Sequence, residues 1–337
     1  MHIRDILKEG SPSFSFEFFP PRTEEGKVHL LTTLRELESL RPSFVSITYG
    51  AGGTTRDLTH DLVTRLKRET ALDPIPHLTC VGHGEEEIEN LLNRYAQAGI
   101  SNILALRGDQ PREPSSPMGD FPHAVDLVRK IRHFRGHHDP RWFGIGVAGF
   151  PEGHPETPNR LREMDHLKAK VEAGADYICT QLFFCNEDFL DFRERCELAG
   201  IRVPILAGIM PVTSLTGLHR MADLAGGTRF PARLLKSLLR AQGDPATLER
   251  IGIHYASEQC ADLLHHDVAG IHFYTLNKSQ ATREIFRNLG LSRQAPLEEV
   301  QKESPTFAGK AGLENSVKTQ DRVCSLTPPT GAALSAR

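Results

Sequence analysis

An alternation of short apolar runs with amphipathic segments constrains the fold of this chain most strongly. The runs are typical of buried β-strands, and we expect strands at residues 13–19, 44–50, 76–82, 102–108, 142–150, 177–184, 203–211 and 270–277. The segments between them have helical periodicity, which is clearest at residues 23–40, 84–100 and 159–175. Three helical segments end in Ala-Gly, at Gly99, Gly174 and Gly200, where glycine suits the left-handed residue that ends a helix. This repeat predicts parallel βα units.

Eight βα units predict an α/β fold that closes into a (β/α)8 barrel of the TIM type. The 337 residues exceed the ~250 that are typical of such barrels. Two further helices, at residues 232–242 and 245–266, account for part of the excess and precede the last strand. A doubly wound open sheet is the alternative, but no GxGxxG motif follows the first strand.

The regular pattern stops after Leu291. The remaining residues are polar and rich in Ser, Thr, Pro and Gly, a composition that cannot bury enough apolar surface to fold. We therefore expect residues 1–291 to form one catalytic barrel and residues 292–337 to form a mostly disordered tail.

Composition and spacing exclude several classes of function. A net charge of -3 without a basic run argues against nucleic acid and favours small-molecule partners. The six cysteines lack CxxC spacing, and no HxH or HExxH motif occurs, so we expect neither disulfides nor a metal. No apolar run approaches the roughly 20 residues of a membrane span, and the first residues lack the apolar core of a signal peptide. These features predict a cytoplasmic protein without a membrane partner.

The active site of a parallel barrel is built at the carboxyl ends of its strands. Polar side chains are concentrated at these positions: Glu17, Thr48, Tyr49, His77, Thr79, Arg107, Asp109, His154, Gln181, Tyr274 and Asn277. We expect these side chains to converge on one site.

Glu17 is unusual because it lies in the aromatic run FSFEFFPPR. Alternation along a strand places Phe16 and Phe18 on one face and Glu17 on the other. A solvated strand end is the alternative, but the neighbouring phenylalanines and prolines favour a partly dry pocket. Burial disfavours the charged form of a carboxyl group, so Glu17 can hold a proton near neutral pH and donate it as a general acid.

Other candidates have competing structural explanations. Asp109 could form a surface ion pair with Arg107 as readily as take part in chemistry. A lone strand histidine such as His77 more often belongs to the core or rim than to a reaction. The glycine-rich residues 49–57 could approach a phosphate or a flat ring, but they match neither a Walker A loop nor a Rossmann fingerprint.

Seven motifs, in this order, resemble those of the methylenetetrahydrofolate reductase family across residues 12–291: FSFEFFPPR, HLTC, ALRGD, GHPE, TQLFF, GIMP and HFYTLN. The resemblance is to the bacterial type, which has the catalytic domain alone and lacks the C-terminal regulatory domain of eukaryotic members. It implies an FAD-dependent barrel of one-carbon metabolism that reduces 5,10-methylenetetrahydrofolate to 5-methyltetrahydrofolate. Hydride from NADH or NADPH would pass to the flavin and then to the folate in a ping-pong reaction. A homo-oligomer is expected.

The resemblance also implies roles for individual residues. Glu17 matches the general acid, and Asp109 matches an aspartate near flavin and pterin whose charge favours a cationic iminium. The positions that match cofactor contacts are Thr48, His77, Leu106, Arg107, Gly108, Asp109, Ala148, Phe150, His154, His166, Lys170 and Tyr274, with Lys170 at the FAD phosphates. The positions that match substrate contacts are Tyr49, Ala51, Gln181, Met221 and Lys278.

Two departures from the family pattern concern the substrate. Met221 stands where bacterial relatives often have an aromatic ring, and Lys278 stands where many relatives have an arginine. Lysine would replace a bidentate clamp on the glutamate tail of folate with one point charge. Two alternatives remain: a flavin-free folate-binding or methyl-transfer barrel, which would be colourless, and a flavin barrel of the proline dehydrogenase type, which would oxidise proline.

Overall fold

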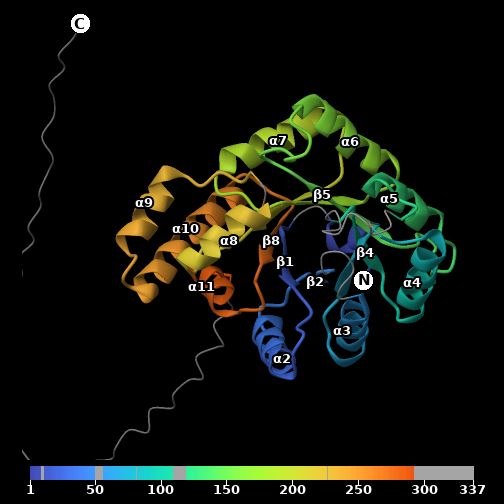
Figure 1. The fold of residues 1–337 in the computed structure, drawn as a ribbon, viewed down its shortest axis with the longest axis horizontal. Coiled ribbons are helices and arrows are strands. Elements are labelled where there is room, and N and C mark those ends of the chain that lie inside the picture. The colour runs from blue at the N-terminus through green and yellow to red at the C-terminus, as the bar shows by residue number, and fades with distance from the viewer. Residues whose placement is uncertain (9–10, 50–55, 81, 109–118, 226, 292–337) are drawn as a thin grey trace, which may run out of the picture. The chain divides into compact units, whose positions relative to one another are not determined.

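Eight parallel strands close into a barrel in the order of the chain (Figure 1). The computed structural model describes residues 1–8, 11–49, 56–80, 82–108, 119–225 and 227–291. The strands are β1 (Ser13–Phe18), β2 (Phe44–Ile47), β3 (Pro74–Thr79), β4 (Asn102–Leu106), β5 (Gly144–Gly149), β6 (Tyr177–Thr180), β7 (Ile205–Ile209) and β8 (Gly270–Tyr274). The predicted barrel is confirmed, and the open sheet is excluded because β1 pairs with β8.

Helices follow the strands around the barrel (Figure 1). They are α1 (Ile3–Ile6), α2 (Glu24–Glu38), α3 (Arg56–Glu69), α4 (Glu85–Gln97), α5 (Ala124–His133), α6 (Arg160–Glu172), α7 (Asn186–Leu198), α8 (Leu215–Ala225), α9 (Ala232–Arg240), α10 (Pro245–His265) and α11 (Gln280–Asn288). The two helices expected before the last strand are α9 and α10. The predicted tail, residues 292–337, lies outside the described residues.

The helix ends follow local sequence rules. Thr23 begins α2 with its side-chain oxygen, which accepts a hydrogen bond of 3.1 Å from the backbone N–H of Gly26. Gly99, Gly174 and Gly200 have φ angles of 72°, 117° and 82°, so the predicted left-handed helix ends are confirmed.

The two faces of β1 separate the core from the site. Phe16 and Phe18 are almost fully buried in the apolar layer between strands and helices, and the Phe16 ring lies 5.7 Å from that of Phe286 on α11. Ser15 and Glu17 occupy the opposite face, inside the barrel. The alternation predicted from FSFEFF is therefore correct.

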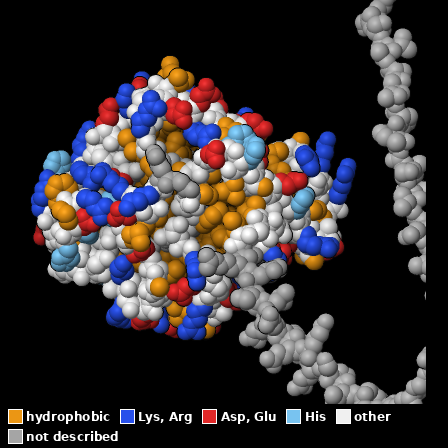
Figure 2. All heavy atoms as spheres, turned by 180° about the vertical axis from the view of Figure 1, so that it is seen from behind, with side chains coloured by type: hydrophobic (Ala, Val, Ile, Leu, Met, Phe, Trp, Pro, Cys, Tyr) orange, Lys and Arg blue, Asp and Glu red, His pale blue; other side chains and the backbone are white. Residues whose placement is uncertain are grey.

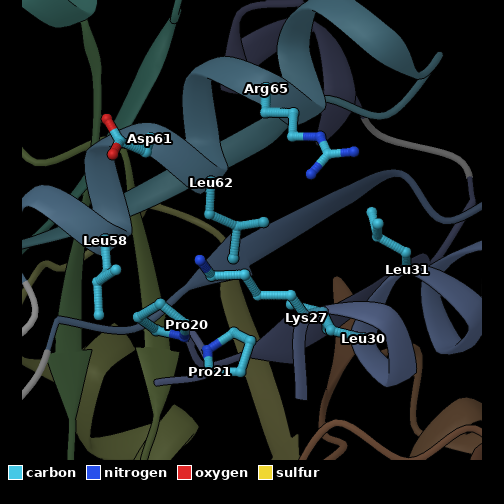
Figure 3. A pocket seen from close by; sticks show the side chains of 9 residues that line it. All are labelled: Pro20, Pro21, Lys27, Leu30, Leu31, Leu58, Asp61, Leu62 and Arg65. Atoms are coloured by element: carbon cyan, nitrogen blue, oxygen red, sulfur yellow. The ribbon is translucent and has the colours of Figure 1, made fainter. Parts of the chain in front are cut away.

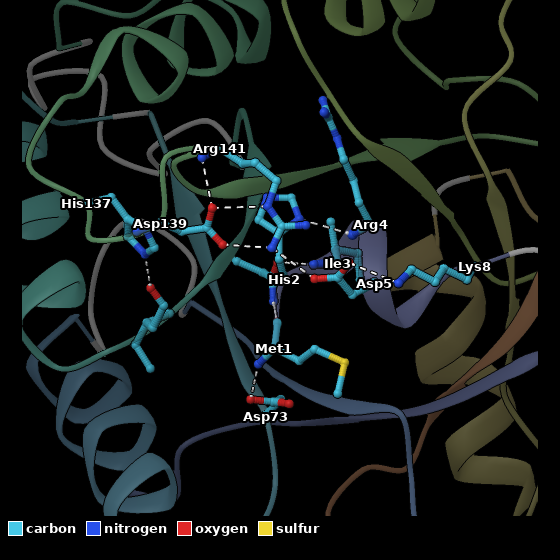
Figure 4. Close-up of polar contacts among 12 residues, drawn as sticks. Met1, His2, Ile3, Arg4, Asp5, Lys8, Asp73, His137, Asp139 and Arg141 are labelled. Carbon is cyan, nitrogen blue, oxygen red and sulfur yellow. Dashed lines mark hydrogen bonds and ion pairs between the residues drawn. The ribbon is translucent and has the colours of Figure 1, made fainter.

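The N-terminal segment lies across the amino ends of the strands (Figure 4). The Met1 ammonium group is 2.6 Å from the carboxylate of Asp73, just before β3. The backbone N–H of Ile3 donates a 2.6 Å hydrogen bond to the side chain of Asn102, the first residue of β4. These contacts cover the barrel at the end opposite to the strand carboxyl termini.

A buried carboxylate strengthens this closure. Asp176, just before β6, has a side chain that is only 1% exposed. It forms ion pairs of 2.6 Å with Arg4 and 2.8 Å with Arg132, and it accepts a 2.8 Å hydrogen bond from the backbone N–H of Ile145. Each carboxylate oxygen is thus satisfied, as a buried charge requires.

Apolar and charged side chains are distributed unevenly over the outer surface. On the face seen in Figure 2, apolar side chains gather near the centre, and charged side chains predominate around the rim. In the part of the chain that the structure describes, no helix combines the length and apolarity needed to cross a bilayer.

Candidate active site

The Glu17 carboxyl group lies at the carboxyl end of β1 and faces two imidazoles. Its Oε2 atom is 3.4 Å from Nε2 of His77 on β3 and 3.6 Å from Nε2 of His272 on β8. The Glu17 side chain remains 18% exposed, which is enough for contact with a ligand. The position combines partial burial with access, as predicted from the sequence.

His77 is the more unusual of the two imidazoles. Its side chain is 8% exposed, and burial lowers its pKa to about 4, so the ring is neutral at neutral pH. Among the described residues, no group forms a hydrogen bond with its Nε2 atom. A buried nitrogen without a partner is costly, and here it stands beside a carboxyl oxygen.

His272 was missed by the sequence reasoning. Its side chain is 1% exposed, its Nδ1 atom lies 2.7 Å from the Ser15 hydroxyl, and its ring stacks on Phe44 with centroids 6.0 Å apart. The signal was present in HFYTLN, because strand alternation places His272 on the same face as Tyr274, which was selected.

Tyr274 crosses the barrel mouth from β8 to β6. Its hydroxyl donates a 2.6 Å hydrogen bond to the backbone oxygen of Thr180, and burial raises the pKa of the phenol well above its usual range. A Cβ atom at Gly208 would lie 2.3 Å from that same oxygen and 2.9 Å from the tyrosine ring. The missing side chain at Gly208 therefore makes room for this crossing.

Tyr49 follows β2, and its side chain contacts a histidine that follows β3. It is 7% exposed, and its hydroxyl lies 3.1 Å from Nε2 of His83, whose Nδ1 is 2.8 Å from the Glu87 carboxylate. His83 was not among the candidate residues named from the sequence. Thr48 precedes Tyr49 and is half-buried, whereas Ala51 lies outside the described residues.

Several cationic or potentially cationic side chains gather where β4 and β5 end. Arg107 forms a 2.7 Å ion pair with Glu156, and burial lowers the pKa of the nearby His154. The Lys170 ammonium group donates a 2.7 Å hydrogen bond to the backbone oxygen of Ala148, and burial lowers its pKa to about 8. His166, on the same helix as Lys170, is exposed.

This donor set fits a phosphate-bearing cofactor. Within the described residues, Lys170 has no hydrogen bond to a carboxylate, so its N–H groups are available to an anion. Gly108 has a φ of 87°, and a Cβ atom there would lie 2.9 Å from Thr79, so the backbone is packed closely where a ligand would approach. Leu106, Ala148 and Phe150 are half-buried at the same end of the barrel.

The remaining substrate positions are spread over the barrel mouth. Gln181 lines a small pocket with Phe150 and Thr228. Met221 is 3% exposed and packs in an apolar cluster that includes Leu182. Lys278 is exposed. Gln181 therefore opens onto a pocket, whereas Met221 is covered.

A second, more apolar groove lies between α2 and α3, outside the barrel (Figure 3). It is lined by Pro20, Pro21, Lys27, Leu30, Leu31, Leu58, Asp61, Leu62 and Arg65. None of these residues was predicted to bind a ligand, and the sequence contains no signal for the groove apart from the apolar faces of the two helices.

Two further predictions concern Asp109 and a metal site. Asp109 lies outside the described residues, so its position is not part of the geometry above. The described residues contain no group of three or more His, Cys, Asp or Glu side chains that could hold a metal ion.

Comparisons with known proteins agree in the family that they indicate. The family model described as methylenetetrahydrofolate reductase matches residues 2–290. The methylenetetrahydrofolate reductase (NADH) 1 of Arabidopsis thaliana is 40% identical over 301 residues, which cover 86% of this chain and 50% of that protein. The 5,10-methylenetetrahydrofolate reductase of Escherichia coli K12 is 38% identical over 283 residues, which cover 84% of this chain and 92% of that protein. This chain therefore spans about half the length of its plant relatives and nearly all of its bacterial ones.

One solved structure is similar in fold. It is a protein from Clostridium thermocellum that is described as binding two copies of 5-methyl-5,6,7,8-tetrahydrofolic acid. The superposition has a TM-score of 0.59 at 16% identity and covers 86% of this chain and 96% of that chain. At this identity the similarity concerns the fold alone.

Proposed function

The chain belongs to the methylenetetrahydrofolate reductase family, and from this premise we propose that it reduces 5,10-methylenetetrahydrofolate to 5-methyltetrahydrofolate with FAD and a reduced nicotinamide nucleotide. The observation that supports this activity best is the carboxyl group of Glu17, partly buried and 3.4 Å from a neutral imidazole at the carboxyl end of the barrel. That is the place and the chemistry of a general acid.

The residues at the ends of β4 and β5 would hold the cofactor. Lys170, Arg107 and His154 would face its phosphates, with His166 at the exposed edge. Thr48, His77, Leu106, Gly108, Ala148, Phe150 and Tyr274 would line the flavin. When bound, FAD supplies the hydride relay between the nicotinamide nucleotide and the folate.

Glu17 would provide the proton that the folate needs. Reduction of the methylene bridge requires its five-membered ring to open, and the departing amine nitrogen must gain a proton. The Glu17 side chain is 18% exposed, and the neighbouring His77 does not compete as an acid, because burial keeps its ring neutral at neutral pH. Asp109 would stabilise the positive charge that develops on the opened folate.

The substrate positions suggest how the two substrates share the site. Gln181, beside Phe150 in the small pocket, would contact either substrate in turn. Tyr49 would present its ring to the nucleotide, since its hydroxyl faces His83. Met221 and Ala51 complete these positions, and the exposed Lys278 would face the glutamate tail of folate. Plant relatives carry NADH in their names, so NADH is the donor to test first.

Anaerobic absorbance spectroscopy of the purified protein tests this function. The protein should show the visible band of oxidised flavin, lose the band on addition of NADH, and regain it on addition of 5,10-methylenetetrahydrofolate, with 5-methyltetrahydrofolate as the product. A colourless protein that binds folate would instead indicate a binding or methyl-transfer barrel. Bleaching by proline would indicate a proline dehydrogenase.

A further inference from the structure

The buried pair of Ser15 and His272 has no role in the function proposed so far. Both side chains are inside the barrel, with Ser15 fully buried and His272 1% exposed. Their contact of 2.7 Å between Oγ and Nδ1 is a hydrogen bond whose direction depends on which ring nitrogen carries the proton. Ser15 has no other hydrogen bond among the described residues, so donation to Nδ1 satisfies its proton.

This hydrogen bond determines which ring nitrogen of His272 carries the proton. If Nδ1 accepts from Ser15, the proton of the neutral ring is on Nε2. Nε2 lies 3.6 Å from Oε2 of Glu17 and 3.4 Å from the hydroxyl of Ser46. The ring N–H therefore has the Ser46 hydroxyl as its hydrogen-bond partner and lies beside the Glu17 carboxyl oxygen.

His77 lies beside the same oxygen, Oε2 of Glu17, and differs from His272 in that its Nε2 nitrogen has no hydrogen-bond partner among the described residues. Its Nε2 atom, 3.4 Å from Oε2 of Glu17, has no hydrogen bond within the described chain, and it can accept one in the tautomer whose proton is on Nδ1. A protonated carboxyl oxygen can accept from one neighbour and donate to another. Oε2 of Glu17 is placed between these two partners.

We propose that Ser15 and His272 are positioning residues that hold the protonated Glu17 carboxyl group beside Nε2 of His77, so that its proton is kept on that side until the folate arrives. The inference rests on the proposed function, since it assumes that Glu17 is the acid.

Within the described residues, other titratable groups face Glu17. They are Cys179 on β6 and Tyr274 on β8, together with the two histidines. Burial raises the pKa of the Cys179 thiol and of the Tyr274 phenol and lowers that of His77 to about 4, so these three are neutral at neutral pH. These three groups therefore form no ion pair with the Glu17 carboxyl group, and hydrogen-bond geometry is left to orient it.

The test compares Ser15→Ala with Ser13→Ala. Ser13 is a buried serine on the same strand, but its hydroxyl donates to the backbone oxygen of Ala269 instead of to His272. In rapid-mixing experiments, Ser15→Ala should slow the reoxidation of the enzyme by folate about tenfold, and its activity should persist to higher pH because the imidazole N–H is no longer held beside the Glu17 carboxylate. Ser13→Ala should match the parent. Reduction by NADH should be unchanged in both variants.

Two substitutions of His272 provide an independent test. His272→Gln can place an amide N–H near the position of Nε2, whereas His272→Asn is too short and mimics Nδ1. Gln should therefore stay within about threefold of the parent in the folate step, and Asn should lose as much as Ser15→Ala. Circular dichroism and flavin content check that each variant is folded.

The outcomes separate this inference from the proposed function. If the parent passes hydride to folate but Ser15→Ala behaves like Ser13→Ala and His272→Asn like His272→Gln, the positioning role is wrong and the reductase stands. If the slowing comes with equal losses in the NADH step and an unchanged pH profile, Ser15 and His272 are merely structural. If the parent does not reduce folate at all, both proposals fail.

Discussion

Oε2 of Glu17 on β1 lies 3.4 Å from Nε2 of His77 on β3, although β2 separates the two strands in the sheet. The contact therefore crosses the interior of the barrel and does not follow the pairing of neighbouring strands. It brings a carboxyl group and a neutral imidazole together in a place that water reaches only in part. The predictions below test this contact and the surroundings on which it depends.

Glu17→Gln should abolish proton donation while preserving the shape of the side chain. We expect the folate step to slow by ~100-fold or more, the typical contribution of a general acid, while FAD content and reduction by NADH remain normal. Stopped-flow absorbance resolves the two steps. Glu172→Gln, on the exposed surface of α6, is the matched control. A folate step within a few fold of the parent would remove Glu17 from the mechanism.

His77 should make the free energy of unfolding depend on pH. Its pKa is about 4 in the folded protein against 6.5 for the free side chain, so between these values the unfolded state binds more protons. The contribution of the neutral ring to stability is thus fully present above 6.5 and is lost as the pH falls toward 4. Measured by urea denaturation, the free energy of unfolding should fall less steeply between pH 6.5 and 4 in His77→Gln than in the parent. The exposed His138→Gln should follow the parent, and parallel curves for all three would contradict the assignment.

Lys170→Met should weaken FAD binding. A charge-assisted hydrogen bond to a phosphate contributes about 1.5–3 kcal/mol, so the dissociation constant should rise at least about tenfold. Because the ammonium has a pKa of about 8, reconstitution of the parent apoprotein should also weaken as the pH rises through 8. Flavin fluorescence during titration measures both effects. Lys168→Met, on the same helix with a more exposed side chain, should leave affinity unchanged.

Asp109→Asn tests the second residue to which the sequence assigns a catalytic role. Removal of a negative charge near the flavin should make the flavin easier to reduce and slow the folate step, because a cationic iminium loses stabilisation. The midpoint potential and the stopped-flow rate are the two measurements. If neither changes, Asp109 is outside the site and the simple ion pair with Arg107 becomes the better explanation.

Asp176→Ala tests the closed amino end of the barrel. Loss of a carboxylate that is 1% exposed leaves Arg132 without its buried partner, and removal of one partner of such a pair typically costs about 3–5 kcal/mol. Asp191→Ala removes a carboxylate that is 65% exposed and paired with Arg195, and should cost less than about 1 kcal/mol. Chemical denaturation measures the free energy of unfolding of both variants. Equal decreases would contradict the conclusion that burial makes the Asp176 ion pairs more important than the exposed one.

The barrel could be predicted because its sequence signals are local and repeated. Each strand, each amphipathic helix and each Ala-Gly helix end is specified by a few neighbouring residues. The expected strands extend too far at their carboxyl ends, as in the run 177–184, of which only Tyr177–Thr180 is strand. The excess residues form the loops that carry the site, and an apolar loop such as Leu182–Phe184 looks like strand in the sequence because it is buried as well.

Only two signals in the sequence predicted the site: the alternation of side chains along the strands and the resemblance to family motifs. Alternation placed Glu17 inside the barrel, but it did not reveal His272, since a histidine between Ile271 and Phe273 looks like part of an apolar strand. Which interior side chains meet depends on the registers of strand pairs far apart in the sequence. The contact of Tyr49 with His83 was missed because both residues lie in the segments that follow β2 and β3, where strand alternation predicts no pairing.

The closure of the barrel between its first and last strands has a consequence for how the protein is made. Ser15 pairs with His272 across 257 positions of sequence, and no shorter stretch of chain can form this contact. Contacts between residues so far apart in the sequence form slowly during folding, because the chain must close a large loop before these contacts can stabilise the fold. A chain still growing on the ribosome therefore has Glu17 without His272 beside it until β8 emerges, and the surroundings of the acid are among the last parts of the molecule to be assembled.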